Sequence, residues 1–239
     1  MVDLHSHVLF GIDDGARNME ESLEMIEAAE KAGIRTIVAT PHLKNYVLAP
    51  EKTHENYRML AEKIKGDNIG IILGFEIMLN HLLEKAPDVL GKYDVGGTGY
   101  LLIEIPYTNY REQSFKMLDD LLRQYNYRII IAHPERMGSG FGHKKAISRL
   151  RKMGFLIQVN TGSILGFYGE GTRKLAKYVI ENGLADFVAS DAHRAESYSW
   201  HEQAYASVVK WSDEAYAERL FRENGRKLLG NKWFLYYGE

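Results

Sequence analysis

The chain has 239 residues, with 30 Lys and Arg against 32 Asp and Glu, a formal net charge of −2 and 45% hydrophobic residues. A chain of this length and composition can bury a large core, which excludes an intrinsically disordered protein. The balanced charge, without a basic block, argues against a nucleic-acid-binding protein. The absence of cysteine excludes disulfides, thiolate metal sites and any mechanism with a cysteine nucleophile.

The sequence shows no targeting or membrane-spanning segment. Asp3 and His5 stand where a signal peptide needs an apolar run, and no apolar run approaches the ~18 residues of a membrane span. We therefore expect a cytoplasmic protein. Because no linker, low-complexity tract or internal repeat divides the sequence, we expect residues 1–239 to form a single domain.

Short β-branched runs alternate with longer segments of helical periodicity, and this alternation predicts a parallel sheet. The expected strands are 2–5, 35–40, 70–75, 100–105, 128–132, 155–160 and 186–190. The expected helices lie near 19–32, 51–65, 80–90, 112–125, 143–153, 171–182 and 200–222. Asn18, with Glu21 three residues later, forms a capping-box pattern that marks the start of the first helix.

Glycines at helix-to-strand junctions divide the chain into similar units. Gly33, Gly154 and Gly183 can each take the left-handed conformation that ends a helix. An open doubly wound sheet and a closed barrel both fit this pattern. A dinucleotide-binding sheet should carry G-x-G-x-x-G after its first strand, but the sequence there is HSHVLFGIDDG. We therefore expect a distorted, TIM-like β/α barrel of about seven strands.

Histidines and carboxylates stand at or near the ends of most expected strands. In a β/α barrel the carboxyl ends of the strands meet at one mouth, so these side chains are expected to share a cavity. The spacing of two between His5 and His7 places both on one face of a strand, and Asp191 and His193 repeat it. The candidate metal ligands are His5, His7, His42, Glu76, Glu104, His133, Asp191 and His193, together with Asp13 or Asp14.

Each candidate also has a purely structural explanation. A single histidine at a strand end is more often hydrogen-bonded or exposed than a metal ligand, and Asp13 and Asp14 could be turn formers. Glu104 lies in an apolar run, where a carboxylate must be paired, protonated or bound to a cation. A repeated coincidence at four strand ends is the weaker explanation, so the pattern favours a metal site.

Histidine and carboxylate ligands without thiolate suit Mn²⁺, Fe or Zn²⁺, with Mg²⁺ as a further alternative. The candidates outnumber the ligands of one tetrahedral ion, so we expect two or three ions. Such a cluster hydrolyses phosphate esters or amides. Amidohydrolases of the barrel type usually bridge their metals with a carboxylated lysine at a strand end. No expected strand here ends in lysine, which favours a phosphate ester as the substrate.

Arg136, three residues after His133, could hold phosphate oxygens in bidentate fashion, or pair with Glu135 or another acid.

These motifs resemble the PHP (polymerase and histidinol phosphatase) superfamily and, within it, the bacterial manganese-dependent protein-tyrosine phosphatases of capsule and exopolysaccharide clusters. The resemblance extends over almost the whole chain. It rests on Asp3-Leu4-His5-Ser6-His7, Asp13-Asp14-Gly15, Thr40-Pro41-His42, Gly74-Phe75-Glu76-Ile77, Leu102-Ile103-Glu104, Ile131-Ala132-His133-Pro134-Glu135-Arg136, Gln158-Val159-Asn160 and Ala189-Ser190-Asp191-Ala192-His193.

The resemblance implies a distorted barrel with a trinuclear site at the carboxyl ends of the strands. One ion would take His5, His7, Glu76 and Asp191; a second would share Glu76 and add Glu104 and His133; a third would take Asp14, His42 and His193. Arg136 would bind phosphate. The family's second arginine has no exact counterpart, and Arg194 is the candidate substitute. The residues expected to carry catalysis are Arg136, Asp191, His193 and Arg194.

The implied activity is hydrolysis of phosphotyrosine by metal-bound hydroxide, without a covalent intermediate. The implied partner is the autophosphorylating tyrosine kinase of polysaccharide assembly. Two alternatives remain open: a histidinol-phosphate or other small-molecule phosphomonoesterase, and a non-catalytic metal-binding module that regulates a kinase. A peptide substrate needs an open mouth, for which the candidate rim aromatics are Tyr107, Tyr110, Phe141 and Tyr168.

Overall fold

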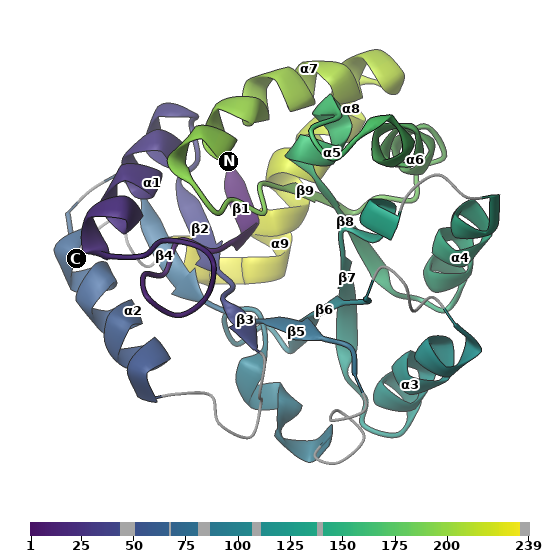
Figure 1. Ribbon diagram of the computed structural model, residues 1–239, viewed down its shortest axis with the longest axis horizontal. Coiled ribbons are helices and arrows are strands. Elements are labelled where there is room, and N and C mark those ends of the chain that lie inside the picture. The colour runs from purple at the N-terminus through teal and green to yellow at the C-terminus, as the bar shows by residue number, and fades with distance from the viewer. Residues whose placement is uncertain (44–50, 67, 81–86, 107–110, 138–140, 235–239) are drawn as a thin grey trace.

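The computed structural model describes residues 1–43, 51–66, 68–80, 87–106, 111–137 and 141–234. All strand pairs are parallel, and helices surround the strands on the outside (Figure 1). The strands are β1 Val2–Ser6, β2 Thr36–Ala39, β3 His42–Leu43, β4 Gly70–Leu73, β5 Glu76–Met78, β6 Tyr100–Glu104, β7 Arg128–Ala132, β8 Leu156–Asn160 and β9 Phe187–Ala189. They pair in the orders β1-β2-β4 and β3-β5-β6-β7-β8-β9.

The helices follow most of the expected segments. The α-helices are α1 Met19–Lys31, α2 Glu51–Lys63, α3 Glu112–Arg123, α4 Phe141–Lys152, α5 Thr161–Leu165, α6 Glu170–Glu181, α7 His201–Trp211, α8 Glu214–Glu218 and α9 Asn224–Leu229. The 3₁₀ turns are Pro87–Tyr93, Pro134–Met137, Ala195–Trp200 and Gly230–Phe234, and Arg219–Glu223 is a π-helical turn. Among the described residues, no helix has the length and apolar character needed to cross a membrane.

Local signals in the sequence are confirmed at several boundaries. The Asn18 side chain accepts a hydrogen bond from the Glu21 N–H (2.9 Å), but the Glu21 carboxylate accepts from the Arg17 N–H, so the capping box is not reciprocal. The glycines at the three predicted junctions have φ of +78°, +96° and +62°. These backbone conformations favour glycine because it has no Cβ.

Two predictions of helices differ from the structure. The segment 200–222 contains α7, α8 and a π-helical turn instead of one helix, and the non-helical backbone of Ser212 and Asp213 interrupts it. Of the helix expected near 80–90, residues 81–86 lie outside the described residues, and the described remainder enters a 3₁₀ turn. Helix α5 was not predicted, because it is a single turn directly after β8.

The second and third expected strands are each followed by a short strand that was not predicted. Pro41 separates β2 from β3, and it has no N–H to donate to a neighbouring strand. Gly74 and Phe75 separate β4 from β5. The chain therefore resumes pairing with His42 directly opposite Glu76. The interruption places two candidate ligands side by side.

The end of β1 meets the segment that follows β9. A single β-bridge joins Ser6 to Ala192, and the Asp191 N–H donates to the His5 carbonyl (2.8 Å). The His7 N–H in turn donates to the Ala192 carbonyl (2.9 Å). The strands thus form the predicted distorted β/α barrel.

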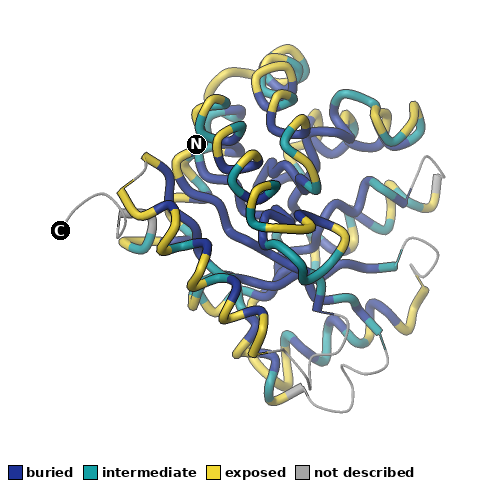
Figure 2. Tube along the Cα trace, turned by 60° about the vertical axis from the view of Figure 1, so that its left-hand side comes forward, coloured by how far each residue is buried: buried dark blue, intermediate teal, exposed yellow. Residues whose placement is uncertain are grey.

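Apolar side chains fill the interior of the barrel. Val2, Leu102 and Ile130 belong to this inner cluster, together with Leu229 of α9. Two outer clusters join the strands to the surrounding helices, and Figure 2 shows the strands as buried and the outer helix faces as exposed. Polar side chains gather at the other end of the barrel, where the strands finish.

Candidate metal centre

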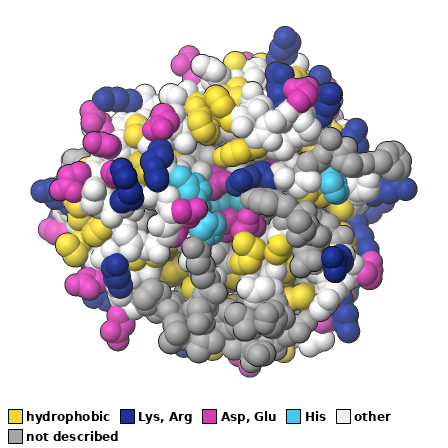
Figure 3. Space-filling view, in the orientation of Figure 1, with side chains coloured by type: hydrophobic (Ala, Val, Ile, Leu, Met, Phe, Trp, Pro, Cys, Tyr) yellow, Lys and Arg dark blue, Asp and Glu magenta, His cyan; other side chains and the backbone are white. Residues whose placement is uncertain are grey.

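The candidate ligands converge on a cavity of ≈ 590 Å³ at the carboxyl ends of the strands. Figure 3 shows histidine and acidic side chains gathered in this hollow, with a basic side chain beside them. Its lining includes Asp14, His42, Glu76, Glu104, His133, Arg136, Asp191, His193 and Arg194. His5 and His7 lie deeper, against Glu76 and Asp191.

Glu76 lies at the centre of this cluster. Its Oε1 atom is 2.9 Å from His133 Nε2, and its Oε2 atom is 2.8 Å from His42 Nδ1. The same Oε2 atom is 3.4 Å from His5 Nε2 and 3.5 Å from His7 Nε2. One buried carboxylate therefore contacts four imidazoles from three different parts of the chain.

Asp191 is the second buried carboxylate. Its Oδ1 atom lies 3.2 Å from His7 Nε2 and 3.4 Å from His5 Nε2. Its Oδ2 atom accepts hydrogen bonds from Asn160 Nδ2 (2.6 Å) and Arg136 Nη1 (3.2 Å). Oδ1 therefore faces the histidines, whereas Oδ2 is held in place by hydrogen bonds from Asn160 and Arg136.

Two of the candidate ligands have strained backbones. His133 has φ +30° and Asp191 has φ +51°, both in a region that non-glycine residues rarely occupy. Such strain persists where the surrounding structure imposes it, and it concentrates at functional sites.

The protein fixes the tautomers of His5 and His7 through hydrogen bonds to their Nδ1 atoms. His5 Nδ1 lies 3.0 Å from Gln158 Oε1, and the Gln158 amide donates to Asn160 Oδ1 (2.7 Å), which assigns Oε1 as the acceptor. His7 Nδ1 lies 2.7 Å from Asp13 Oδ2. Each neutral ring therefore has its proton on Nδ1 and its lone pair on Nε2, and the two Nε2 atoms are 3.3 Å apart. This arrangement is typical of metal-ligating histidines.

The cluster has the donor set and the unmet charge that a divalent cation would satisfy. Within the described residues, Glu76 Oε2 and Asp191 Oδ1 are buried but accept no well-directed hydrogen bond. Buried carboxylates next to imidazole lone pairs need a cation or protons to offset their charge. Four sets have ligand atoms within 4.8 Å of one another: His5, His7 and Glu76; His5, His133 and Asp191; His42, Glu76 and Glu104; and His7, Asp14, His42 and His193.

These sets differ in detail from the ligand sets that the resemblance implied. In the structure, His7 belongs to the same set as Asp14, His42 and His193. Glu104 groups with His42 and Glu76, without His133. The structure thus brings every candidate ligand to one place, and the role of each remains a prediction.

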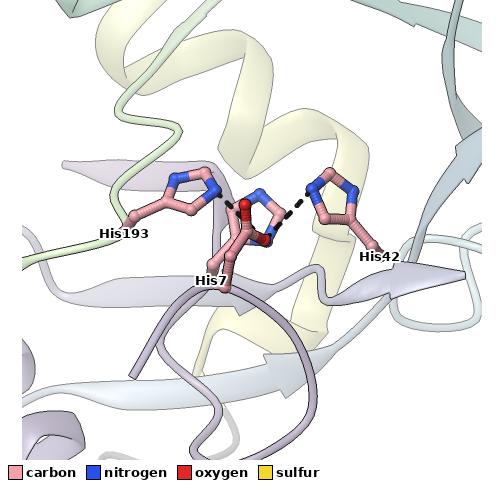
Figure 4. Close-up of side chains that lie close together, drawn as sticks. His7, His42 and His193 are labelled. Atoms are coloured by element: carbon pink, nitrogen blue, oxygen red, sulfur yellow. Dashed lines mark ion pairs between the residues drawn. The ribbon is translucent and has the colours of Figure 1, made fainter. Parts of the chain in front are cut away.

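Asp13 and Asp14 occupy different positions. Asp13 is held by three contacts: it faces His7 Nδ1, and it accepts from the N–H groups of Gly15 and His42 (2.9 Å each). Asp14 lines the cavity, with Oδ1 3.4 Å from His42 Nε2 and 3.7 Å from His193 Nε2. Figure 4 shows the three histidines His7, His42 and His193 around this carboxylate. The geometry favours Asp14 as the ligand and Asp13 as a positioning residue.

The buried charges shift the pKa values of their neighbours. Burial lowers the pKa of His5, but Glu76 and Asp191 outweigh it and raise this pKa to about 9. Burial raises the pKa of Asp13, but the hydrogen bond and charge of His7, together with the N–H groups of Gly15 and His42, outweigh it and lower this pKa to about 2. Burial also lowers the pKa of His193. Protons and metal ions therefore compete for the same imidazole nitrogens.

The two candidate phosphate-binding arginines have different surroundings. The Arg136 guanidinium lies over the Tyr168 ring, with Cζ 4.4 Å from the ring centroid, and reaches Asp191. Arg194 Nη1 donates to the carbonyls of Asp14 (3.0 Å) and Gly15 (2.7 Å). Arg136 thus points at the cluster, whereas Arg194 holds the loop that carries Asp14.

Tyr168 lines the cavity as predicted for a rim aromatic, while Tyr107 and Tyr110 lie outside the described residues. Phe141 is the first residue of α4. Sequence reasoning missed Trp200, which also lines the cavity, and the roles of Gln158 and Asn160. The signal available for the last pair was their spacing of two, which places both on one face of β8.

We expect the metal-free protein to lose stability as the pH rises from about 6.5 to about 9. The pKa of His5 is about 9 in the fold and ~6.5 in the unfolded chain. Its stabilising contribution is complete below the unfolded pKa and disappears as the pH passes the folded pKa. Because Mn²⁺ competes with this proton, its stabilising effect should grow over the same range. Thermal unfolding with chelator and with Mn²⁺ measures both trends, and parallel pH profiles would contradict this linkage.

Asn160→Ala should weaken Mn²⁺ binding by ~10- to 100-fold, because it removes the donor that orients Asp191 and the partner of Gln158. Calorimetric titration of the metal-free variant measures this loss, with circular dichroism as the check on folding. The matched control is Asn182→Ala, since Asn182 is exposed and donates only to the Tyr178 carbonyl at the end of α6. Unchanged affinity in a folded Asn160→Ala variant would refute the positioning role.

Comparison with known proteins agrees with this geometry. Residues 1–230 match the family described as "Capsular polysaccharide synthesis, CpsB/CapC". The chain is 31% identical to tyrosine-protein phosphatase YwqE of Bacillus subtilis, over 97% of this chain and 92% of that protein. It is 32% identical to tyrosine-protein phosphatase CpsB of Streptococcus pneumoniae, over 96% of this chain and 98% of that protein.

Solved structures show the same relationship. The crystal structures of YwqE and CpsB, described as unique metal-dependent tyrosine phosphatases, include a chain that matches with a TM-score of 0.76 at 29% identity, over 99% of this chain and 94% of that one. Histidinol phosphate phosphatase of Lactococcus lactis, solved with zinc, L-histidinol and phosphate, matches with a TM-score of 0.55 at 13% identity, over 89% and 94%. The second likeness shows the fold alone. The chain belongs to the CpsB/CapC family of capsular polysaccharide synthesis proteins.

Proposed function

We propose that this protein is a metal-dependent protein-tyrosine phosphatase. The observation that carries the proposal is the convergence of Glu76, Asp191 and their histidines beside the guanidinium of Arg136. The tyrosine-phosphatase activity for which YwqE and CpsB are named supports it, because both relatives match nearly the whole chain. The absence of cysteine agrees with a phosphatase that needs no thiolate nucleophile.

The proposed cofactor is a cluster of two or three divalent ions, with Mn²⁺ first and Fe, Zn²⁺ or Mg²⁺ as alternatives. Divalent ions supply hydroxide at neutral pH and neutralise charge on phosphate oxygens. The residues that would hold them are His5, His7, Asp14, His42, Glu76, Glu104, His133, Asp191 and His193.

Arg136 is the residue proposed to orient the phosphate group. Tyr168 covers one face of its guanidinium and Asp191 holds Nη1, so the side chain is fixed before the substrate arrives. A fixed guanidinium can donate two parallel hydrogen bonds to phosphate oxygens and stabilise the charge of the transition state. Arg194 contributes by holding the Asp14 loop, and a direct phosphate contact from it is a further expectation.

The leaving group explains why the cluster needs no strong general acid. A tyrosine phenolate has a pKa of ~10 and leaves more readily than an alkoxide. Burial lowers the pKa of His193, so its ring is neutral at pH 7 and remains available as a ligand. The site is therefore better suited to an aryl phosphate than to an alkyl phosphate.

The proposed substrate is a phosphotyrosine-bearing protein, specifically the tyrosine kinase of capsular or exopolysaccharide assembly. The family's association with capsular polysaccharide synthesis supports this choice. Such a kinase consumes cytoplasmic ATP, so we expect the phosphatase to act in the cytoplasm. The full set of ligand-type side chains around the cavity argues against a purely regulatory module.

The decisive assay compares phosphate release from a phosphotyrosyl peptide and from histidinol phosphate, each with Mn²⁺ and with a chelator. We expect peptide turnover that the chelator abolishes. Turnover of histidinol phosphate alone would replace the substrate but keep the metal centre, and absence of both activities would contradict the proposal.

His133→Ala should lower kcat for the peptide by at least ~100-fold, because the ring contacts Glu76 at the centre of the cluster. Metal content by mass spectrometry should fall in the same variant. The matched control is His54→Ala, which changes an exposed histidine on α2, outside the cavity. Near-normal turnover in a folded His133→Ala variant would refute the site assignment.

A further inference from the structure

An exposed aromatic pair stands at the rim of the metal cavity. The Phe167 side chain is 59% exposed, more than any other large hydrophobic side chain in the described part of the chain. Its ring stacks on Trp200, with centroids 4.3 Å apart and planes inclined by 23°. Trp200 lines the cavity, whereas Phe167 lies beyond it. We call these two residues the aromatic ledge.

A rigid turn presents Phe167 to solvent. The turn begins at Gly166 and ends at Gly169, with φ of +89° and +92°. The Phe167 N–H donates to the Gly162 carbonyl, and the Gly169 N–H donates to the Gly166 carbonyl (2.9 Å each). The exposure of Phe167 is therefore imposed by the backbone of a well-bonded turn.

Trp200 of the ledge and Tyr168 both pack closely against the backbone at Gly162. A Cβ added at Gly162 would lie 2.9 Å from Tyr168 Cε2 and 3.0 Å from Trp200 Cζ3. Tyr168 in turn lies beneath the Arg136 guanidinium. An aromatic surface thus continues from the phosphate-orienting arginine, along the cavity wall, to Phe167 outside it.

The ledge fits one side chain better than a protein surface. The other exposed large hydrophobic side chains in the described residues are Met59 and Tyr125, which belong to α2 and to the turn after α3 and do not line the cavity. An isolated pair of rings is too small for a stable dimer interface. One face of Phe167 is covered by Trp200, which leaves the opposite face for a third ring in an offset stack.

We propose that the aromatic ledge binds an aromatic side chain of the substrate peptide, close in sequence to the phosphotyrosine. The inference rests on the proposed phosphatase function and defines its substrate class: an extended peptide, not a single phosphorylated residue. A substrate that fills only the cavity does not reach Phe167, because this ring does not line the cavity. The ledge therefore selects for the sequence around the phosphotyrosine.

A double-mutant cycle between enzyme and peptide tests the ledge. The Mn²⁺-loaded full chain, as wild type and as Phe167→Ala, is assayed with two phosphotyrosyl peptides, one with aromatic residues beside the phosphotyrosine and one with alanine there. We expect wild type to prefer the aromatic peptide by about 5-fold in kcat/KM, mainly through KM, as one aromatic stack allows. In Phe167→Ala this preference should fall to nearly one. Phe167→Tyr should keep the preference, and Met59→Ala is the control for loss of an exposed apolar side chain.

The outcomes separate the two proposals. Equal kcat/KM for both peptides in wild type, or a preference that survives in Phe167→Ala, overturns the ledge and leaves the phosphatase intact. A loss of the same size in Met59→Ala also overturns it, because the effect would not be specific to the ledge. Absence of phosphate release from either peptide by wild type overturns both proposals.

Discussion

Two buried carboxylate oxygens that face two imidazole lone pairs are the interaction on which this structure depends. Glu76 Oε2 and Asp191 Oδ1 both lie within 3.5 Å of the Nε2 atoms of His5 and His7. Four electron-rich atoms in a buried space repel one another unless protons or a cation separate them. Protonation and metal binding at this end of the barrel therefore each change the free energy of folding.

The surrounding residues hold this unfavourable arrangement in position. Asn160 and Arg136 fix the outer oxygen of Asp191, whose backbone is strained, and Gln158 and Asp13 fix the two imidazoles. β8 supplies no candidate ligand, and its two inward amides act only through their neighbours. In a centre organised in this way, folding already places the side chains in their working positions. Little reorganisation of these side chains is then needed when the substrate binds.

The sequence predicted the alternation of strands and helices, the glycines that end helices, and the convergence of the candidate ligands. These features depend on local conformation and on the parallel order of the strands. The sequence did not predict the short strand after Pro41 that places His42 opposite Glu76, since a two-residue strand has no periodicity to detect. It left Asp13 and Asp14 undecided, because their difference arises from contacts with His7 and with distant segments. The exposure of Phe167 could not be predicted either, because the sequence does not distinguish an exposed aromatic ring from a buried one.

The seam between β1 and β9 has a consequence for how the protein matures. β1 and the segment after β9 meet at a β-bridge between Ser6 and Ala192, and the adjacent Asp191 N–H donates to the His5 carbonyl. The first and the last candidate ligands along the chain therefore flank the same seam. During synthesis, Asp191 and His193 join the amino-terminal histidines and Glu76 only after most of the chain has left the ribosome. Metal loading is thereby tied to completion of the barrel, and a nascent chain cannot hold a finished centre.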